Sequence, residues 1–125
     1  MTEDELSSHI IKAAIKVHRI LGPGLLESVY EKVLAYDLRK SGFTVRNQVP
    51  IKINYEDIVF DEGFRGDLIV EDKVIVEIKS VKALEPVFYK QVLTYLRFSG
   101  KKLGLLLNFN MVMLKAGIKR VVLGL

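Results

Sequence analysis

The chain has 125 residues, of which 50% are hydrophobic and 27% charged, so we expect a single folded domain over residues 1–125 rather than a disordered chain. It contains no cysteine, which excludes disulfide bonds, thiolate zinc sites and a cysteine nucleophile. The acidic start, Met1–Ser8, lacks the pattern of a signal peptide, and no apolar run is long enough to span a membrane. We therefore expect a cytoplasmic protein with no membrane partner.

The charge is divided unevenly along the sequence. The formal net charge is +4, but residues 1–77 contain 10 Lys/Arg and 14 Asp/Glu, whereas residues 78–125 contain nine Lys/Arg and one acid, Glu85. The second part alone thus carries a charge of +8. Such a basic region favours binding of a polyanion. A solvated surface that is merely basic is the alternative interpretation.

The first third of the chain predicts two helices. Thr2 begins a capping box, and the apolar residues that follow recur at helical intervals, which indicates a helix over Glu3–Leu21. The turn Gly22-Pro23-Gly24 interrupts it. A second helix is expected over Leu25–Ser41, with Gly42 as its C-terminal stop.

The rest of the chain predicts a sheet and one further helix. The expected strands are Val45–Tyr55, Ile58–Phe60, Asp67–Val70, Val74–Ile78, Leu103–Phe109 and Ile118–Leu123. Pro50 indicates a break or a sheet edge in the first of them. The helix begins near Pro86 and ends before Gly100. This order of elements predicts an α/β (α+β) protein, with one mixed sheet and helices packed on it.

The most informative segment is the expected hairpin that ends in Glu77-Ile78-Lys79. Both of its strands are so apolar that a charged side chain is costly there unless it is paired or bound to a metal. Glu77 and Lys79 are two residues apart and share a face of the strand. A three-residue turn at Glu71-Asp72-Lys73 would also set Asp67 opposite Glu77. Two carboxylates about 5 Å apart could share a hard cation such as Mg²⁺ or Mn²⁺.

In this reading each residue of the hairpin has a role. Asp67 and Glu77 ligate the cation, and the backbone carbonyl of Ile78 adds a third oxygen. Lys79 orients an attacking water and stabilises the charge that develops on phosphorus. The alternative interpretation is an ordinary ion pair between Lys79 and one of the two acids.

Two pairs of helical residues extend this candidate site. Glu27 and Tyr30 are three residues apart and share a helix face, so Glu27 could complete a carboxylate cluster. Gln91 and Tyr95 are four apart, and Gln91 could contact a phosphate or the metal-bound water. A surface glutamate in a first helical turn and a core tyrosine are the alternatives. His18 is interpreted as a packed or capping residue rather than a ligand.

Several motifs of this sequence occur together in a known family. They are Gly24-x-x-Glu27-x-x-Tyr30, Phe64-Arg-Gly-Asp67-Leu-Ile-Val, Ile75-Val-Glu77-Ile-Lys79-Ser, Gln91-x-x-x-Tyr95-Leu, Gly104-Leu-Leu-Leu-Asn108-Phe109 and Lys119-Arg120. In order and spacing they resemble the GxxExxY proteins, a compact branch of the PD-(D/E)XK nuclease superfamily. The resemblance covers Ala14 to about Val122. It implies a restriction-endonuclease-like core, in which helices flank a mixed sheet.

The resemblance also implies a set of site residues, with the last two forming the helix pair of RecB-like nucleases. The set is Glu27, Asp67, Glu77, Lys79, Gln91 and Tyr95. One position departs from the family, because Phe88 stands where many members have histidine. The metal ligands are unaffected by this difference. They are Glu27, Asp67, Glu77 and the carbonyl of Ile78.

Together these observations predict a Mg²⁺- or Mn²⁺-dependent phosphodiesterase, a nuclease that hydrolyses the backbone of DNA or, as the second choice, RNA. The basic part of the chain would hold the nucleic acid backbone with little base readout. One alternative is a non-catalytic module that keeps the nuclease fold and binds nucleic acid. Another is a dimerising interaction module, in which the apolar segment Val121–Leu125 pairs with a second copy in a homodimer.

Overall fold

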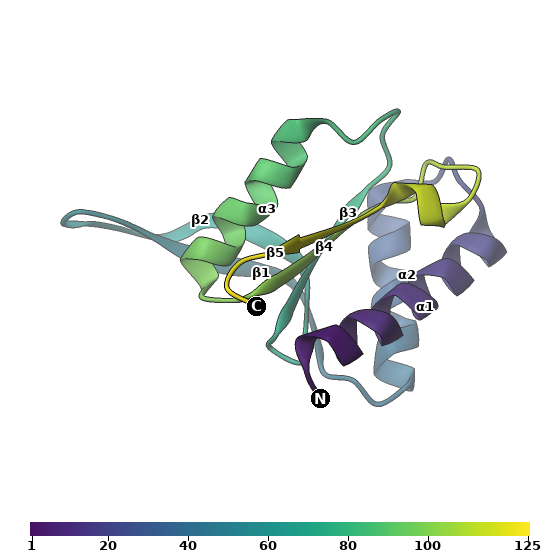
Figure 1. Ribbon diagram of the computed structural model, residues 1–125, viewed down its shortest axis with the longest axis horizontal. Helices are drawn as coiled ribbons and strands as arrows, with labels where there is room; N and C mark the ends of the chain where they lie inside the picture. The colour runs from purple at the N-terminus through teal and green to yellow at the C-terminus, as the bar shows by residue number, and fades with distance from the viewer.

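A computed structural model describes all residues, 1–125, as a five-stranded sheet with helices on both faces (Figure 1). The elements are α1 (Glu3–Leu21), α2 (Glu27–Lys40), β1 (Val45–Tyr55), β2 (Ile58–Val70), β3 (Val74–Lys79), α3 (Pro86–Ser99), β4 (Leu103–Asn108), the short 3₁₀ helix η1 (Leu114–Gly117) and β5 (Ile118–Val122). The predicted mixed sheet flanked by helices is confirmed.

The strands lie in the sheet in their order along the chain, β1 to β5. Only β3 and β4 are parallel, and α3 makes the crossover between them, as a parallel pair requires. The carboxyl ends of β3 and β4 therefore meet at one edge, where Lys79 pairs with Asn108. Lys79, the last residue of the Glu77-Ile78-Lys79 segment, therefore lies where these two strands end.

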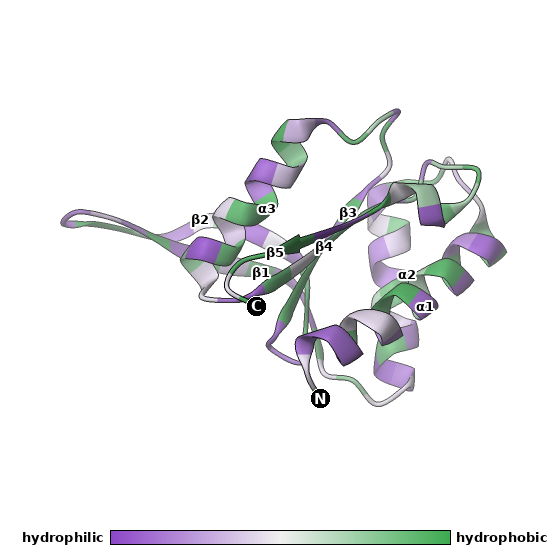
Figure 2. Ribbon diagram, viewed as in Figure 1, coloured by the Kyte–Doolittle hydropathy of each residue, from purple (hydrophilic) through white to green (hydrophobic).

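Each face of the sheet has its own core. The larger core joins α1 and α2 to one face, and alternate residues of β3 (Val74, Val76 and Ile78) point into it. The smaller core joins α3 to the other face, where Ile75 packs with Val92 and Leu96. Figure 2 shows hydrophobic and hydrophilic residues interspersed along the helices, as expected of helices that cover a sheet with one side only. Since side chains alternate along a strand, Glu77 and Lys79 share the α3 face with Ile75.

The predicted elements agree with the structure except in β2. The separate strands expected at Ile58–Phe60 and Asp67–Val70 are wrong, because a single strand runs from Ile58 to Val70. Its charged and glycine-rich centre broke the apolar alternation on which the prediction rested, but the ladder with β1 resumes beyond it after a register shift between Ile51 and Ile53. Gly63 is needed there, since a β-carbon would collide with the side chain of Ile53 across the ladder. The remaining boundaries are identical or agree to within two residues, and the largest difference is that α2 begins at Glu27 rather than Leu25.

The distal halves of β1 and β2 form an arm, Asn54–Gly63, that projects from the body of the protein (Figure 1). It is a two-stranded ribbon, because β3 pairs only with Leu68–Val70 of β2. The arm carries four acids and no Lys or Arg. Four exposed apolar side chains accompany the acids: Tyr55, Ile58, Val59 and Phe60. Of the three α-helices, none is long and apolar enough to cross a membrane.

Tyr30 fixes the turn that precedes α2. Its fully buried ring stacks on Phe109, with 4.4 Å between ring centroids. Its hydroxyl donates to the carbonyl oxygen of Gly22 at 2.6 Å and accepts from the backbone N–H of Leu25 at 3.1 Å. Gly24, within this turn, has a φ of 96°, which favours glycine. The turn and the start of α2 are thus held by one buried side chain.

We predict that Tyr30→Phe lowers the free energy of unfolding by about 1–3 kcal/mol, because it leaves two backbone groups of the turn without their partner. Urea unfolding followed by circular dichroism measures the change. Tyr36→Phe is the matched control, since Tyr36 lies on the same helix and is 62% exposed. Equal stability of the two variants would contradict this role for Tyr30.

Candidate active site at the ends of β2 and β3

The carboxylates of Asp67 and Glu77 lie side by side where β2 and β3 separate. The antiparallel ladder pairs Val70 with Val74, as expected from the three-residue turn, and extends to Leu68 and Val76. Beyond it, side chains replace the ladder bonds. The backbone N–H of Asp67 donates to Oε1 of Glu77 at 3.2 Å, and the backbone N–H of Ile78 donates to Oδ2 of Asp67 at 2.8 Å. Each acid is thereby fixed by the other strand's residues.

Glu77 is almost completely buried, with only 6% of its surface exposed. Burial, together with the negative charge of Asp67, raises its pKa to about 9, while Lys79 acts in the opposite direction. An ionised carboxylate is costly in such a place unless a cation or a proton neutralises it. The site therefore combines a strongly perturbed acid with a second acid in direct contact, a pattern that is enriched at functional sites.

Tyr95 of α3 lies close enough to the two acids to be affected by their charges. Its ring stacks on Phe64 of β2 with 3.9 Å between centroids and an interplanar angle of 12°. Burial raises the pKa of Tyr95, and the charges of Glu77 and Asp67 raise it further, which places its hydroxyl within their electrostatic reach. Gln91, one turn earlier on α3, is exposed. Of the expected helix pair, Tyr95 thus lies near the acids, whereas Gln91 faces solvent.

Lys79 and Phe88 are in contact. The ammonium nitrogen of Lys79 lies 4.6 Å from the centroid of the Phe88 ring, which is a cation–π geometry. Phe88 is the position at which the resemblance to the GxxExxY proteins led us to expect histidine. In this chain the ring holds the lysine by its π face, a role for which the aromatic character is sufficient and titration is not needed.

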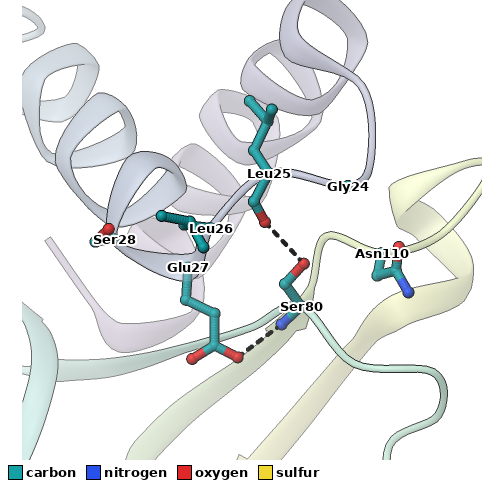
Figure 3. A pocket seen from close by; sticks show the side chains of 7 residues that line it. All are labelled: Gly24, Leu25, Leu26, Glu27, Ser28, Ser80 and Asn110. Atoms are coloured by element: carbon teal, nitrogen blue, oxygen red, sulfur yellow. Dashed lines mark hydrogen bonds between the residues drawn. The ribbon is translucent and has the colours of Figure 1, made fainter.

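Glu27 stands at the start of α2 and contacts the chain directly after Lys79. Its Oε2 accepts a hydrogen bond of 2.9 Å from the backbone N–H of Ser80, and the Ser80 hydroxyl donates to the carbonyl oxygen of Leu25 at 3.1 Å (Figure 3). An open pocket of about 590 Å³ lies here. It is lined by Gly24, Leu25, Leu26, Glu27, Ser28, Ser80 and Asn110. Glu27 thus ties α2 to the carboxyl end of β3.

The segment after β3 is fixed from the neighbouring strand as well. Asn108, only 1% exposed, accepts from the backbone N–H of Val81 at 3.1 Å and donates to its carbonyl oxygen at 3.0 Å. Both the end of β4 and the segment after Lys79 are therefore immobilised by one amide side chain. Because Ser80 directly precedes Val81, Asn108 also helps to position the backbone N–H that donates to Glu27.

Two residues near Asp67 were not expected from the sequence. Glu31 of α2 is 8% exposed and accepts hydrogen bonds from Gln48 at 2.6 Å and from Asn47 at 3.0 Å. The same Gln48 amide also donates to Oδ1 of Asp67 at 3.3 Å. The spacing of Glu31 from Glu27, one helical turn, is the signal that could have suggested it.

The predicted site residues are thus partly assembled. Asp67, Glu77 and Tyr95 come together, and Lys79 follows on the same strand. The structure gathers no group of three His, Asp or Glu side chains close enough to hold one metal ion. Glu27 therefore lies at the end of β3 rather than in one cluster with Asp67 and Glu77. His18 is packed against Phe109 and contacts the carbonyl oxygen of Met111 through Nε2 at 2.8 Å, as its interpretation as a packed residue anticipated.

Comparison with known proteins identifies the family. The sequence model of the PD-(D/E)XK nuclease superfamily matches residues 4–121, which is nearly the whole chain. Comparison with curated proteins gave no match, and comparison with solved structures gave none either. The chain belongs to the PD-(D/E)XK nuclease superfamily, and its five-stranded mixed sheet with flanking helices is the restriction-endonuclease-like fold of that superfamily. The finer resemblance to the GxxExxY proteins stays a prediction.

The raised pKa of Glu77 predicts how stability depends on pH without divalent cations. The folded protein holds a proton on Glu77 up to about pH 9, whereas the unfolded chain releases it near the ordinary value of 4.5. The contribution of Glu77 to the free energy of unfolding is therefore largest below pH 4.5 and decreases as the pH rises toward 9. Because a glutamine side chain cannot ionise, Glu77→Gln should gain about 2 kcal/mol or more over the wild type between pH 5 and 9.

Urea unfolding in EDTA across this pH range measures the difference. Glu56→Gln is the matched control, because Glu56 lies exposed at the tip of the arm and its replacement should leave the pH dependence unchanged. A constant difference between Glu77→Gln and the wild type from pH 5 to 9 would show that Glu77 is not the perturbed group.

Proposed function

We propose that this protein is a divalent-cation-dependent nuclease that hydrolyses phosphodiester bonds, with DNA as the first substrate class and RNA as the second. The observation that carries the proposal is the contact between Asp67 and Glu77 where β2 and β3 separate, followed on β3 by Lys79. Binding of nucleic acid alone does not require a buried carboxylate beside a second acid, since both repel an anionic ligand. Their retention in a nuclease superfamily member therefore favours catalysis over binding.

The chemistry of the two acids fits Mg²⁺ or Mn²⁺. Carboxylate oxygens are the ligands these ions prefer. Glu77 is buried beside Asp67, and the positive charge of a cation would offset the cost of its ionisation. We assign Asp67 and Glu77 as the principal ligands, with the carbonyl oxygen of Ile78 as a further oxygen donor. Glu27, which the sequence offered as a fourth ligand, lies outside this cluster and instead holds the backbone N–H of Ser80 after β3. A bound cation of this kind supplies a Lewis acid for the phosphoryl oxygens and makes water easier to ionise.

The remaining residues act around this pair. The Lys79 ammonium, steadied over Phe88, stabilises the negative charge that grows on the phosphoryl oxygens as water attacks phosphorus. Tyr95, stacked on Phe64 and within electrostatic reach of the acids, is assigned a role in limiting the access of bulk water to them. Gln91 is exposed one turn away and is assigned a contact with a phosphate of the substrate.

The positive charge of the second part of the chain supports a nucleic acid as the substrate. The segment from Ile78 to Leu125 includes Lys79, α3, β4 and β5 and has a net charge of +8. Basic residues that follow the catalytic strand can hold the phosphate backbone without reading the sequence of the bases.

The first test is cleavage of labelled single- and double-stranded DNA and RNA in Mg²⁺, Mn²⁺ or EDTA. We expect cation-dependent cleavage that Asp67→Ala and Lys79→Ala each reduce by about 100-fold or more. Asp72→Ala is the matched control, because Asp72 lies in the turn of the same hairpin, is exposed, and pairs with Arg46 and Lys101 away from the site. Its activity should equal that of the wild type.

Each outcome of this experiment decides between the functions. Cleavage that persists in both site variants would assign the activity to another protein in the preparation. No cleavage of any substrate by folded wild-type protein in Mn²⁺, with measurable nucleic acid binding, would favour the non-catalytic binding module.

A separate prediction concerns nucleic acid affinity. With Asp67→Ala, which should not cut, the affinity for a fluorescent duplex should fall by about 10-fold or more between about 50 and 200 mM salt, since phosphate contacts release counterions. Fluorescence anisotropy measures this. An affinity independent of salt would contradict a role for the basic part of the chain.

A further inference from the structure

In both β1 and β2, the alternation of side chains between the two faces of the sheet reverses at one point. Val45 packs into the α1–α2 core, whereas Val49, four residues later, packs into the α3 core. Residues an even number apart share a face in a regular strand, so the alternation of β1 reverses between them. β2 behaves in the same way, because Leu68 belongs to the α1–α2 core and Phe64 to the α3 core.

The reversal lies at Gln48 and Asp67. The ladder pairs Asn47 with Leu68 and Val49 with Gly66, so Gln48 and Asp67 are the one residue of each strand left between these pairs. Gln48 has a φ of 50°, in the left-handed region that side chains other than glycine rarely occupy. Unusual backbone of this kind persists where surrounding contacts determine it, and it concentrates at functional sites.

The Gln48 side chain forms hydrogen bonds on both sides of this residue. Its amide nitrogen donates to Glu31 at 2.6 Å and to Asp67 at 3.3 Å, so one NH₂ group connects an acid of α2 with an acid of the candidate active site. Both acceptors are carboxylates, and the donor between them offsets their mutual repulsion. Asp67 then has one oxygen bonded to Gln48 and the other to the backbone N–H of Ile78.

A second amide holds Glu31 in place. Asn47 donates to the other oxygen of Glu31 at 3.0 Å, and its own side-chain oxygen accepts from Arg39 at 2.6 Å. Arg39 also donates to the carbonyl oxygen of Val45 at 2.7 Å. A continuous chain of hydrogen bonds thus runs from the C-terminal turn of α2 through Glu31 and Gln48 to Asp67.

We propose that Gln48 is the positioning residue of the site, which sets the orientation of the Asp67 carboxylate and is itself held by the buried Glu31. This inference rests on the proposed function for its catalytic consequence, but the geometry concerns residues of this chain alone. Gln48 does not touch the substrate. It acts by fixing one oxygen of Asp67, so that both oxygens have a defined direction before any cation binds.

The first experiment measures the contact without metal or substrate. Urea unfolding in EDTA of the wild type, Gln48→Ala, Asp67→Ala and the double variant forms a double-mutant cycle. If Gln48 holds Asp67, the effects of the two substitutions on the unfolding equilibrium constant should be non-additive by at least about threefold. Gln48→Gly provides a second variant that accommodates the left-handed φ, in case Gln48→Ala does not fold. Additive effects would overturn the proposal, whatever the activity of the protein.

The second experiment separates positioning from general stabilisation. Asn47→Ala is the matched control, because it also removes one amide bond to Glu31 from β1 but does not contact Asp67. Calorimetric titration with Mn²⁺ should show affinity about 10-fold weaker for Gln48→Ala and Gln48→Gly, and within about twofold of the wild type for Asn47→Ala.

The results distinguish the two claims. Equal loss of Mn²⁺ affinity in the Asn47 and Gln48 variants, or no loss in either, would reduce Gln48 to a structural residue and overturn its role at the site. Failure of the wild type to bind Mn²⁺ or cut nucleic acid would overturn the proposed function, and the metal-free cycle would still decide whether Gln48 orients Asp67.

Discussion

The burial of Glu77 beside a second carboxylate, that of Asp67, is the constraint on which the rest of this structure depends. Glu77 lies near the carboxyl end of β3 among buried apolar residues, with Asp67 of β2 beside it, and water has little access to Glu77 to stabilise its charge. The protein meets this cost with backbone groups, since the N–H groups of Asp67 and Ile78 each bond to an acid. These donors are rigid because they belong to the strands themselves. The positions of the acids therefore depend on the sheet, and the sheet depends on the two cores that cover it.

The sequence was sufficient to predict the elements with strong local signals. The capping box at Thr2, the Gly-Pro-Gly turn, and Pro86 with Gly100 at the ends of the third helix all correspond to observed boundaries within two residues. The contact of Asp67 with Glu77 was also predictable, because a three-residue turn leaves only one register for two short apolar strands. In that instance the local geometry determined the contact at the centre of the candidate site.

What could not be predicted depends on contacts between distant segments. The continuity of β2 comes from its ladder with β1, which overrides the weak strand propensity of its charged and glycine-rich centre. The sequence did not indicate Gln48 as a site residue, because its role depends on its backbone conformation and on a hydrogen bond to Glu31, 17 residues away. The position of Glu27 relative to the acids also follows from how α2 packs on the sheet. Helix periodicity gives the face of a residue but not its distance from a strand.

The reversal of faces in β1 and β2 has a consequence for how the length of this hairpin can vary. Between the reversal and the body of the sheet, adding one residue to either strand would move every following side chain to the opposite core, including Leu68 and Val70. Beyond it, in the projecting arm, no helix covers either face, so residues can be added or lost in opposed pairs without disturbing a core. The hairpin thus joins a segment whose length must stay constant, which carries Asp67, to the arm, whose length can vary without disturbing either core.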